Sequence, residues 1–110
     1  MKGTYLGEFE ELVMLATGIL QEGAYGVSIT KEIETQTGRT VNIGAVHTAL
    51  HRLEEKGFLK SKFGEATEVR GGKRKRIFSL TSQGVKALRE SQELRNHMWS
   101  LLPKVIIQRY

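Results

Sequence analysis

The chain has 110 residues, of which 39% are hydrophobic and 26% charged, so it can bury one compact core and is neither disordered nor membrane-like in composition. It contains no cysteine, which excludes disulfide bonds, thiolate catalysis and zinc sites built on cysteine. No apolar run approaches the ~20 residues of a membrane span, and the first residues lack the apolar core of a signal peptide. We therefore expect a soluble, cytoplasmic protein.

The formal net charge of +5 is unevenly distributed along the chain. Residues 1–46 carry three Lys or Arg and six Glu, whereas residues 47–76 carry nine Lys or Arg and four Glu. A surface that binds a polyanion needs such a concentration of cations, because each neutralised phosphate releases condensed counterions. A solvated surface would also explain the charge alone, so the pattern of the neighbouring elements decides between the two.

Hydrophobic periodicity predicts three helices in the first half of the chain. The first covers residues 6–21, with glutamates in its first turn, and the second covers about 24–37; a glycine follows each. The third begins after Asn42, a good N-cap, and ends near residue 56. Its apolar stripe, which we expect to face the core, consists of Ile43, Val46, Leu50 and Leu53.

The second and third helices are short and closely linked, which is typical of a helix-turn-helix, whose later helix enters the major groove of DNA. The side opposite the apolar stripe presents hydrogen-bonding side chains and one small residue that permits close approach. Asn42 and His47, near the start of the helix, are best placed for base or phosphate contacts. The candidate DNA-binding residues of this segment are Asn42, Gly44, His47, Thr48, His51 and Arg52.

Strand-like alternation follows over residues 58–63 and again over 75–80, and the polar stretch between them contains a Gly71-Gly72 turn signal. We therefore expect a two-stranded hairpin. Its basic tip can follow a phosphate backbone or enter a minor groove, because a glycine turn allows close approach. The candidate DNA-binding cations of the tip are Arg70, Lys73, Arg74, Lys75 and Arg76.

A final helix is predicted from Ser82, with Thr81 as its N-cap and Pro103 producing a kink or a new turn. Its second half is strongly apolar, and burying one large aliphatic side chain stabilises a protein by roughly 1.5–3 kcal/mol. This surface could pack on the first helix, but we favour packing against a second copy, because helix-turn-helix regulators often dimerise to bind paired half-sites. The predicted dimer interface comprises Leu94, Met98, Leu101, Leu102, Val105 and Ile106.

Several segments resemble the PadR-like family of bacterial transcriptional regulators. They include residues 6–12 and 24–27, and above all residues 46–57, which are similar to the family's recognition helix and end in the sequence RLEEKG. The basic tip, followed by Phe-Ser-Leu-Thr at 78–81, resembles the family's wing and the exit from it. The resemblance covers about residues 6–90.

The resemblance implies an α+β, mostly α fold: a winged helix-turn-helix DNA-binding domain over 1–81, with three helices and a two-stranded wing, followed by a long C-terminal dimerisation helix over 82–110. It implies a homodimeric repressor that binds a roughly palindromic operator, with helix 42–56 in the major groove and the basic wing at 64–76. The family's common tyrosine in the recognition helix is His47 here, so this contact with DNA can differ or depend on pH.

Some relatives stack planar aromatic compounds on a tryptophan between their C-terminal helices. Trp99 stands in the matching segment and is the candidate effector-stacking residue, although a plain interface position is the favoured interpretation.

Other functions find less support in the sequence. His47 and His51 have the i, i+4 spacing of a metal-binding pair, but two ligands rarely suffice, so we expect no metal and no cofactor. The chain lacks a G-x-S-x-G motif and a complete P-loop, so we expect no enzyme. The main alternative is a winged-helix module that binds nucleic acid without sequence preference, or a protein partner. A regulator should bind one palindromic site at least ~10³-fold more tightly than random duplex, and such a module should not.

Overall fold

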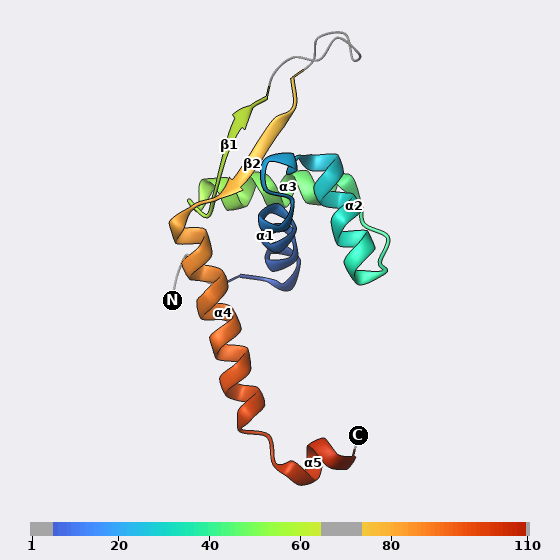
Figure 1. Cartoon of the computed structure of the whole chain (residues 1–110), viewed down its shortest axis with the longest axis vertical. Coiled ribbons are helices and arrows are strands. Elements are labelled where there is room, and N and C mark those ends of the chain that lie inside the picture. Colours follow the sequence, from blue (N-terminus) through green and yellow to red (C-terminus); the bar gives the residue numbers. More distant parts are fainter. Residues whose placement is uncertain (1–5, 65–73, 110) are drawn as a thin grey trace.

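The structure is a computed structural model that describes residues 6–64 and 74–109. Its elements are three helices, a two-stranded hairpin and two C-terminal helices (Figure 1). In chain order they are α1 Glu8–Leu20, the 3-10 turn η1 Gln21–Gly23, α2 Gly26–Thr37, α3 Ile43–Glu55, β1 Leu59–Phe63, β2 Arg76–Leu80, α4 Ser82–Ser100 and α5 Lys104–Arg109. The predicted α+β winged-helix fold is confirmed.

One hydrophobic core holds the first three helices and the hairpin together. The apolar stripe predicted for α3 is buried at Val46, Leu50 and Leu53, where it meets α1 and α2. Ile43 departs from that prediction, because 42% of it is exposed. It is the first residue of α3, so the buried stripe begins one turn later. The largest fully buried side chains are Met14, Ile29, Leu50, Leu53, Leu59, Val13, Val46 and Thr17.

The second helix begins at Gly26, two residues later than predicted. Ser28 fixes this start, because its Oγ accepts a hydrogen bond from the Tyr25 amide (3.0 Å) and donates one to the Gly23 carbonyl (2.6 Å). Ala24 is extended and accepts a hydrogen bond from the Phe78 amide at 2.8 Å. The chain before α2 is thereby attached to strand β2.

The hairpin is antiparallel, with Leu59 opposite Leu80 and Phe63 opposite Arg76. Thr81 joins it to α4: the Thr81 hydroxyl donates to the Gly57 carbonyl (2.6 Å) and accepts from the Gly84 amide (3.0 Å), as expected for an N-cap. A Cβ on Gly84 would lie only 2.2 Å from the Phe58 carbonyl oxygen. A glycine is therefore required where the first turn of α4 crosses the strand.

The first half of α4 packs on the domain, where Ala87 is buried and Leu88 packs against the core, whereas the rest of α4 and α5 project away from the domain (Figure 1). The radius of gyration is 16.6 Å, against about 13 Å for a compact chain of this length. The single long helix predicted over 82–110 is two helices, since α4 ends at Ser100 and α5 follows Pro103. The amides of Ile106 and Ile107 donate to the Pro103 carbonyl, so Pro103 starts the new helix as predicted. None of the helices in the described part of the chain is long and apolar enough to span a membrane.

Candidate nucleic-acid interface

The outer face of α3 is solvent-exposed, as the sequence predicts for a recognition helix. Gly44, His47, Thr48, His51 and Arg52 are all exposed. Asn42 serves as the N-cap, and its Oδ1 accepts hydrogen bonds from the amides of Gly44 (2.6 Å) and Ala45 (3.2 Å). Because Oδ1 is engaged in the cap, the side-chain amide nitrogen is the group of Asn42 available to DNA.

His47 lies in a cleft of about 260 Å³ between α2, α3 and the base of the hairpin. Its imidazole sits against the backbone of Gly26, the first residue of α2. Arg76, the first residue of β2, and Lys75 directly before it contribute to the same cleft. The cleft is lined by Tyr25, Gly26, Val27, His47, Lys75, Arg76 and Phe78. The structure thus brings a predicted residue of the recognition helix next to two predicted cations of the wing.

The cations at the base of the wing are held in place by specific contacts. Arg76 donates from Nε to the Ser61 hydroxyl (2.9 Å) and from Nη2 to the Glu54 carboxylate (3.3 Å), which links both strands to α3. The ammonium of Lys75 lies 4.1 Å from the centre of the Tyr25 ring, a cation–π contact. Arg74 donates from Nε to the Gly64 carbonyl (2.8 Å). Arg70 and Lys73 lie outside the described residues.

The predicted residues on the other edge of α3 lie in a different environment. Thr48 and Arg52 line a shallow groove with Glu8 and Glu10 from the first turn of α1. Glu10 forms an ion pair with Lys56, with Nζ 3.1 Å from Oε1. Arg52 and Lys56 share this groove with the two glutamates, so its charge is mixed, unlike the edge of α3 that lies beside Lys75 and Arg76.

Glu8 is engaged with the linker before α3. The Arg39 guanidinium donates to both carboxylate oxygens of Glu8, at 3.3 and 2.5 Å, and this hydrogen bonding lowers the pKa of Glu8 and raises that of Arg39. The interaction is present above the ordinary pKa of a glutamate and is lost as the pH falls through the lowered value. At neutral pH the pair therefore ties α1 to the linker.

His51 also has a carboxylate neighbour, since its Nε2 lies 3.5 Å from Glu55 one turn further along α3. Both side chains are mostly exposed, so this contact is weak and can give way to DNA. Within residues 6–64 and 74–109, no three His, Cys, Asp or Glu side chains lie close enough together to hold a metal ion.

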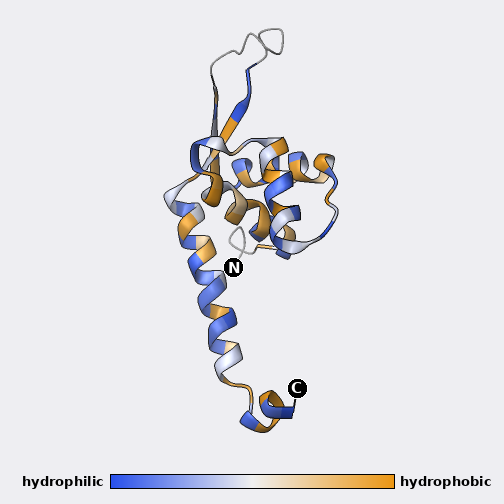
Figure 2. Cartoon of the chain, turned by 45° about the vertical axis from the view of Figure 1, so that its right-hand side comes forward, coloured by the Kyte–Doolittle hydropathy of each residue, from blue (hydrophilic) through white to orange (hydrophobic). Residues whose placement is uncertain are grey.

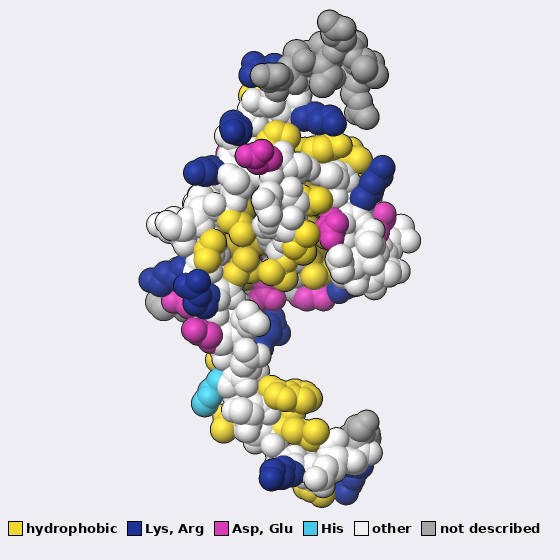
Figure 3. All heavy atoms as spheres, in the orientation of Figure 1, with side chains coloured by type: hydrophobic (Ala, Val, Ile, Leu, Met, Phe, Trp, Pro, Cys, Tyr) yellow, Lys and Arg dark blue, Asp and Glu magenta, His cyan; other side chains and the backbone are white. Residues whose placement is uncertain are grey.

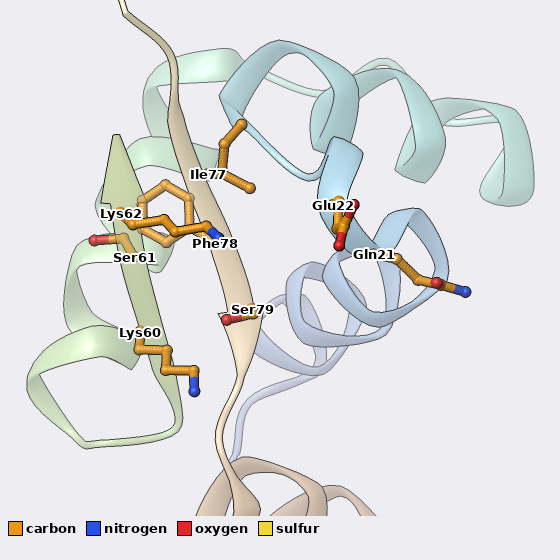
Figure 4. Close-up of a pocket in the computed structure, with 8 residues that line it drawn as sticks. All are labelled: Gln21, Glu22, Lys60, Ser61, Lys62, Ile77, Phe78 and Ser79. Carbon is orange, nitrogen blue, oxygen red and sulfur yellow. The ribbon is translucent and has the colours of Figure 1, made fainter. Parts of the chain in front are cut away.

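The opposite face of the hairpin forms a second groove, of about 580 Å³, against η1 (Figure 4). Side chains alternate along a strand, and Ser61 points to Glu54 on α3, so Lys60 and Lys62 point away from α3. Glu22 stands across the groove from these two lysines (Figure 4). The groove therefore mixes both signs of charge over the apolar side chain of Ile77, unlike the cleft that holds His47.

The sequence did not identify Tyr25, Gly26 and Val27 as part of the candidate interface. All three line the cleft, and Tyr25 orients Lys75. The available signal was an aromatic residue and a glycine at the start of the first helix of a helix-turn-helix. Their proximity to His47 and Lys75 depends on tertiary packing, so periodicity along the chain could not reveal it.

The predicted dimer residues form an apolar segment at the far end of the molecule. Every residue from 92 to 109 is exposed, including six large hydrophobic side chains that are 38–66% exposed. Figure 2 shows the hydrophilic middle of α4 between this segment and the domain. Next to this segment, α4 contacts the domain through polar groups: Ser91 donates to Glu11, and Arg95 pairs with Glu11 at 3.5 Å. The six side chains are Leu94, Met98, Leu101, Leu102, Val105 and Ile106.

Two further hydrophobic residues belong to the same segment. Ile107, which the sequence analysis did not include, is 41% exposed, and Trp99 is 62% exposed. The role of Trp99 as a stacking surface for an aromatic effector stays a prediction.

The sequence pattern of the transcriptional regulator PadR-like family matches residues 17–90, more than half of the chain. No curated protein sequence matches the chain. Solved structures are similar over most of their length. A transcriptional regulator from Clostridium thermocellum is 28% identical, with a TM-score of 0.64 and coverage of 90% of this chain and 89% of that chain.

Two PadR family transcriptional regulators are comparably similar. The protein from Eggerthella lenta is 26% identical, with a TM-score of 0.67 and coverage of 90% and 86% of the two chains. The protein from Clostridium difficile is 27% identical, with a TM-score of 0.62 and coverage of 93% and 97%. These relatives are regulators of transcription rather than enzymes. The chain belongs to the PadR-like family of transcriptional regulators.

Proposed function

We propose that this DNA-binding regulator is a sequence-specific repressor that binds a palindromic operator as a homodimer. In this proposal α3 lies in the major groove, and the basic wing at 64–76 contacts the neighbouring backbone or minor groove. The observation that carries it is the cleft where His47 of α3 meets Lys75 and Arg76 at the start of β2. A base-contacting helix and phosphate-contacting cations thereby share one surface.

The distribution of charge supports the same surface. Figure 3 shows several Lys and Arg side chains around the hairpin. The N-terminus of α2 opens onto the cleft, and the partial positive charge of a helix N-terminus adds to that of the cations. A phosphate backbone passing over the wing base would meet these groups together.

The apolar C-terminal segment supports the homodimer. Among the described residues nothing covers it, and leaving several large hydrophobic side chains in water is unfavourable. The domain carries a second apolar patch at Leu15, Ile19 and Val85, which are 49, 57 and 40% exposed. Figure 3 shows hydrophobic side chains over the middle of the domain and again near the C-terminal end. In a symmetric dimer, the C-terminal segment of each protomer can cover both sets of side chains.

The operator is tested by titrating the protein against a library of genomic DNA fragments at two salt concentrations and sequencing the bound fragments. We expect an inverted-repeat site that binds at least ~10³-fold more tightly than random duplex, with a steep dependence on salt. Weak binding with the same affinity for all duplex sequences would contradict the proposal and favour a winged-helix module with another role.

The dimer is tested with Leu101→Asp, which places a charge in the proposed apolar interface. Since an unpaired charge is costly to bury, we expect the dimer dissociation constant to rise by roughly 10²-fold or more, with the domain still folded. Sedimentation velocity measures the association, and circular dichroism the fold. Asn96→Asp introduces the same charge on the other side of α4 and should leave the dimer intact. A folded Leu101→Asp variant that stays dimeric would show that the interface is assigned wrongly.

The phosphate-contacting role of the wing base is tested with Lys75→Gln. Removing one phosphate contact should weaken binding to operator and random duplex alike, and should reduce the slope of log affinity against log salt by about 1. Lys104→Gln, at the opposite end of the molecule, removes the same charge and should leave the slope unchanged. An unchanged slope for Lys75→Gln would exclude Lys75 from the DNA contacts.

A further inference from the structure

Gly26, at the start of α2, lies directly against the side chain of His47 on the exposed face of α3. A Cβ on Gly26 would lie 2.5 Å from Cε1 of His47, 2.9 Å from Nε2 and 3.4 Å from Nδ1. No real Cβ tolerates the first two distances, so only glycine permits this position of the imidazole. Gly26 is itself buried, at the first position of α2. One edge of the imidazole is thus packed on the backbone of a neighbouring helix.

The other groups of the cleft leave this arrangement of His47 intact. Lys75 makes a cation–π contact with the ring of Tyr25, and Arg76 donates hydrogen bonds to Glu54 and Ser61. His51, the other imidazole on this face of α3, pairs with Glu55. The main determinant of the His47 orientation in the described structure is therefore the space left by the missing side chain of residue 26.

We propose that Gly26 is a positioning residue for operator specificity, and that it holds His47 in the orientation that recognises one purine in each half-site. This inference rests on the proposed function above. Purines present the N7 acceptor in the major groove, and an imidazole N–H is a suitable donor to it. Since Nε2 lies nearer to Gly26, the donor in this proposal is Nδ1. A side chain that packing already holds in one orientation loses less rotamer freedom on binding than a freely rotating one. Its contact with a base therefore contributes more to affinity.

Gly26→Ala separates positioning from folding. The added methyl group would meet the end of a rotatable, exposed side chain rather than backbone, and alanine is a good helix former. We therefore expect the fold to persist, with the thermal midpoint within about 3 °C of wild type, and His47 to rotate away from α2. Gly23→Ala is the matched control, because a Cβ there would meet nothing within 4 Å.

The experiment is a double-mutant cycle of Gly26→Ala and His47→Ala, measured on the selected operator, on operators changed at one base pair at a time, and on random duplex. Gly26→Ala should bind the operator about 10-fold more weakly while its affinity for random duplex is unchanged. It should also lose the preference for one particular purine that His47→Ala loses. In the His47→Ala background, Gly26→Ala should have no further effect. Gly23→Ala should behave as wild type.

Other outcomes overturn the inference in distinguishable ways. If the wild-type protein binds specifically but Gly26→Ala keeps every base preference, this inference is wrong and the proposed function stands. The same holds if Gly26→Ala and His47→Ala weaken binding independently, so that their fold-changes in affinity multiply. A large loss of stability in Gly26→Ala contradicts it too, because rotation of His47 should absorb the methyl group. Wild-type protein that binds operator and random duplex equally overturns the proposed function and this inference together.

Discussion

Burial of one side of α3 is the constraint on which the rest of the structure depends. Val46 and Leu53 are fully buried and Leu50 nearly so, and these three side chains meet α1 and α2 at the centre of the core. Truncating such a residue to alanine typically costs 2–5 kcal/mol, a large share of the stability of a small domain. Because that side must face inward, the side that carries Gly44, His47 and His51 must face outward. The same burial that stabilises the domain therefore presents its candidate recognition surface.

Polar contacts then set the hairpin against this helix. Glu54 accepts from Ser61 on β1 (2.7 Å) and from Arg76 on β2 (3.3 Å), so one carboxylate on α3 engages both strands. Arg76 is about half exposed, so these contacts add little to stability. Their consequence is geometric, because they fix the wing base beside the recognition helix. Lys75 and His47 consequently open onto one cleft although they are far apart in the sequence.

Much of this arrangement follows from local sequence. The apolar period of α3, the Asn42 and Thr81 caps and the alternating strands predict elements close to those observed, because each depends on neighbours in the chain. The late start of α2 was missed because hydrophobic periodicity does not locate the cap that Ser28 forms with Tyr25 and Gly23, and because the attachment of Ala24 to Phe78 is non-local. The packing of His47 on Gly26 and of Lys75 on Tyr25 was missed for the same reason. The groove of mixed charge beside Arg52 likewise arises only when α1 packs against α3.

The central claim is that the His47 edge of α3, the start of α2 and the wing base form one DNA-contacting surface. It is tested most directly by recording amide chemical shifts of the 15N-labelled protein while adding a duplex that contains the selected site. We expect the largest shifts on Gly26, Val27, Gly44, His47 and Lys75, with small shifts at Glu8 and Glu10. Shifts concentrated at Glu8, Glu10 and Arg52, or along Lys60 and Lys62 beside η1, would contradict it.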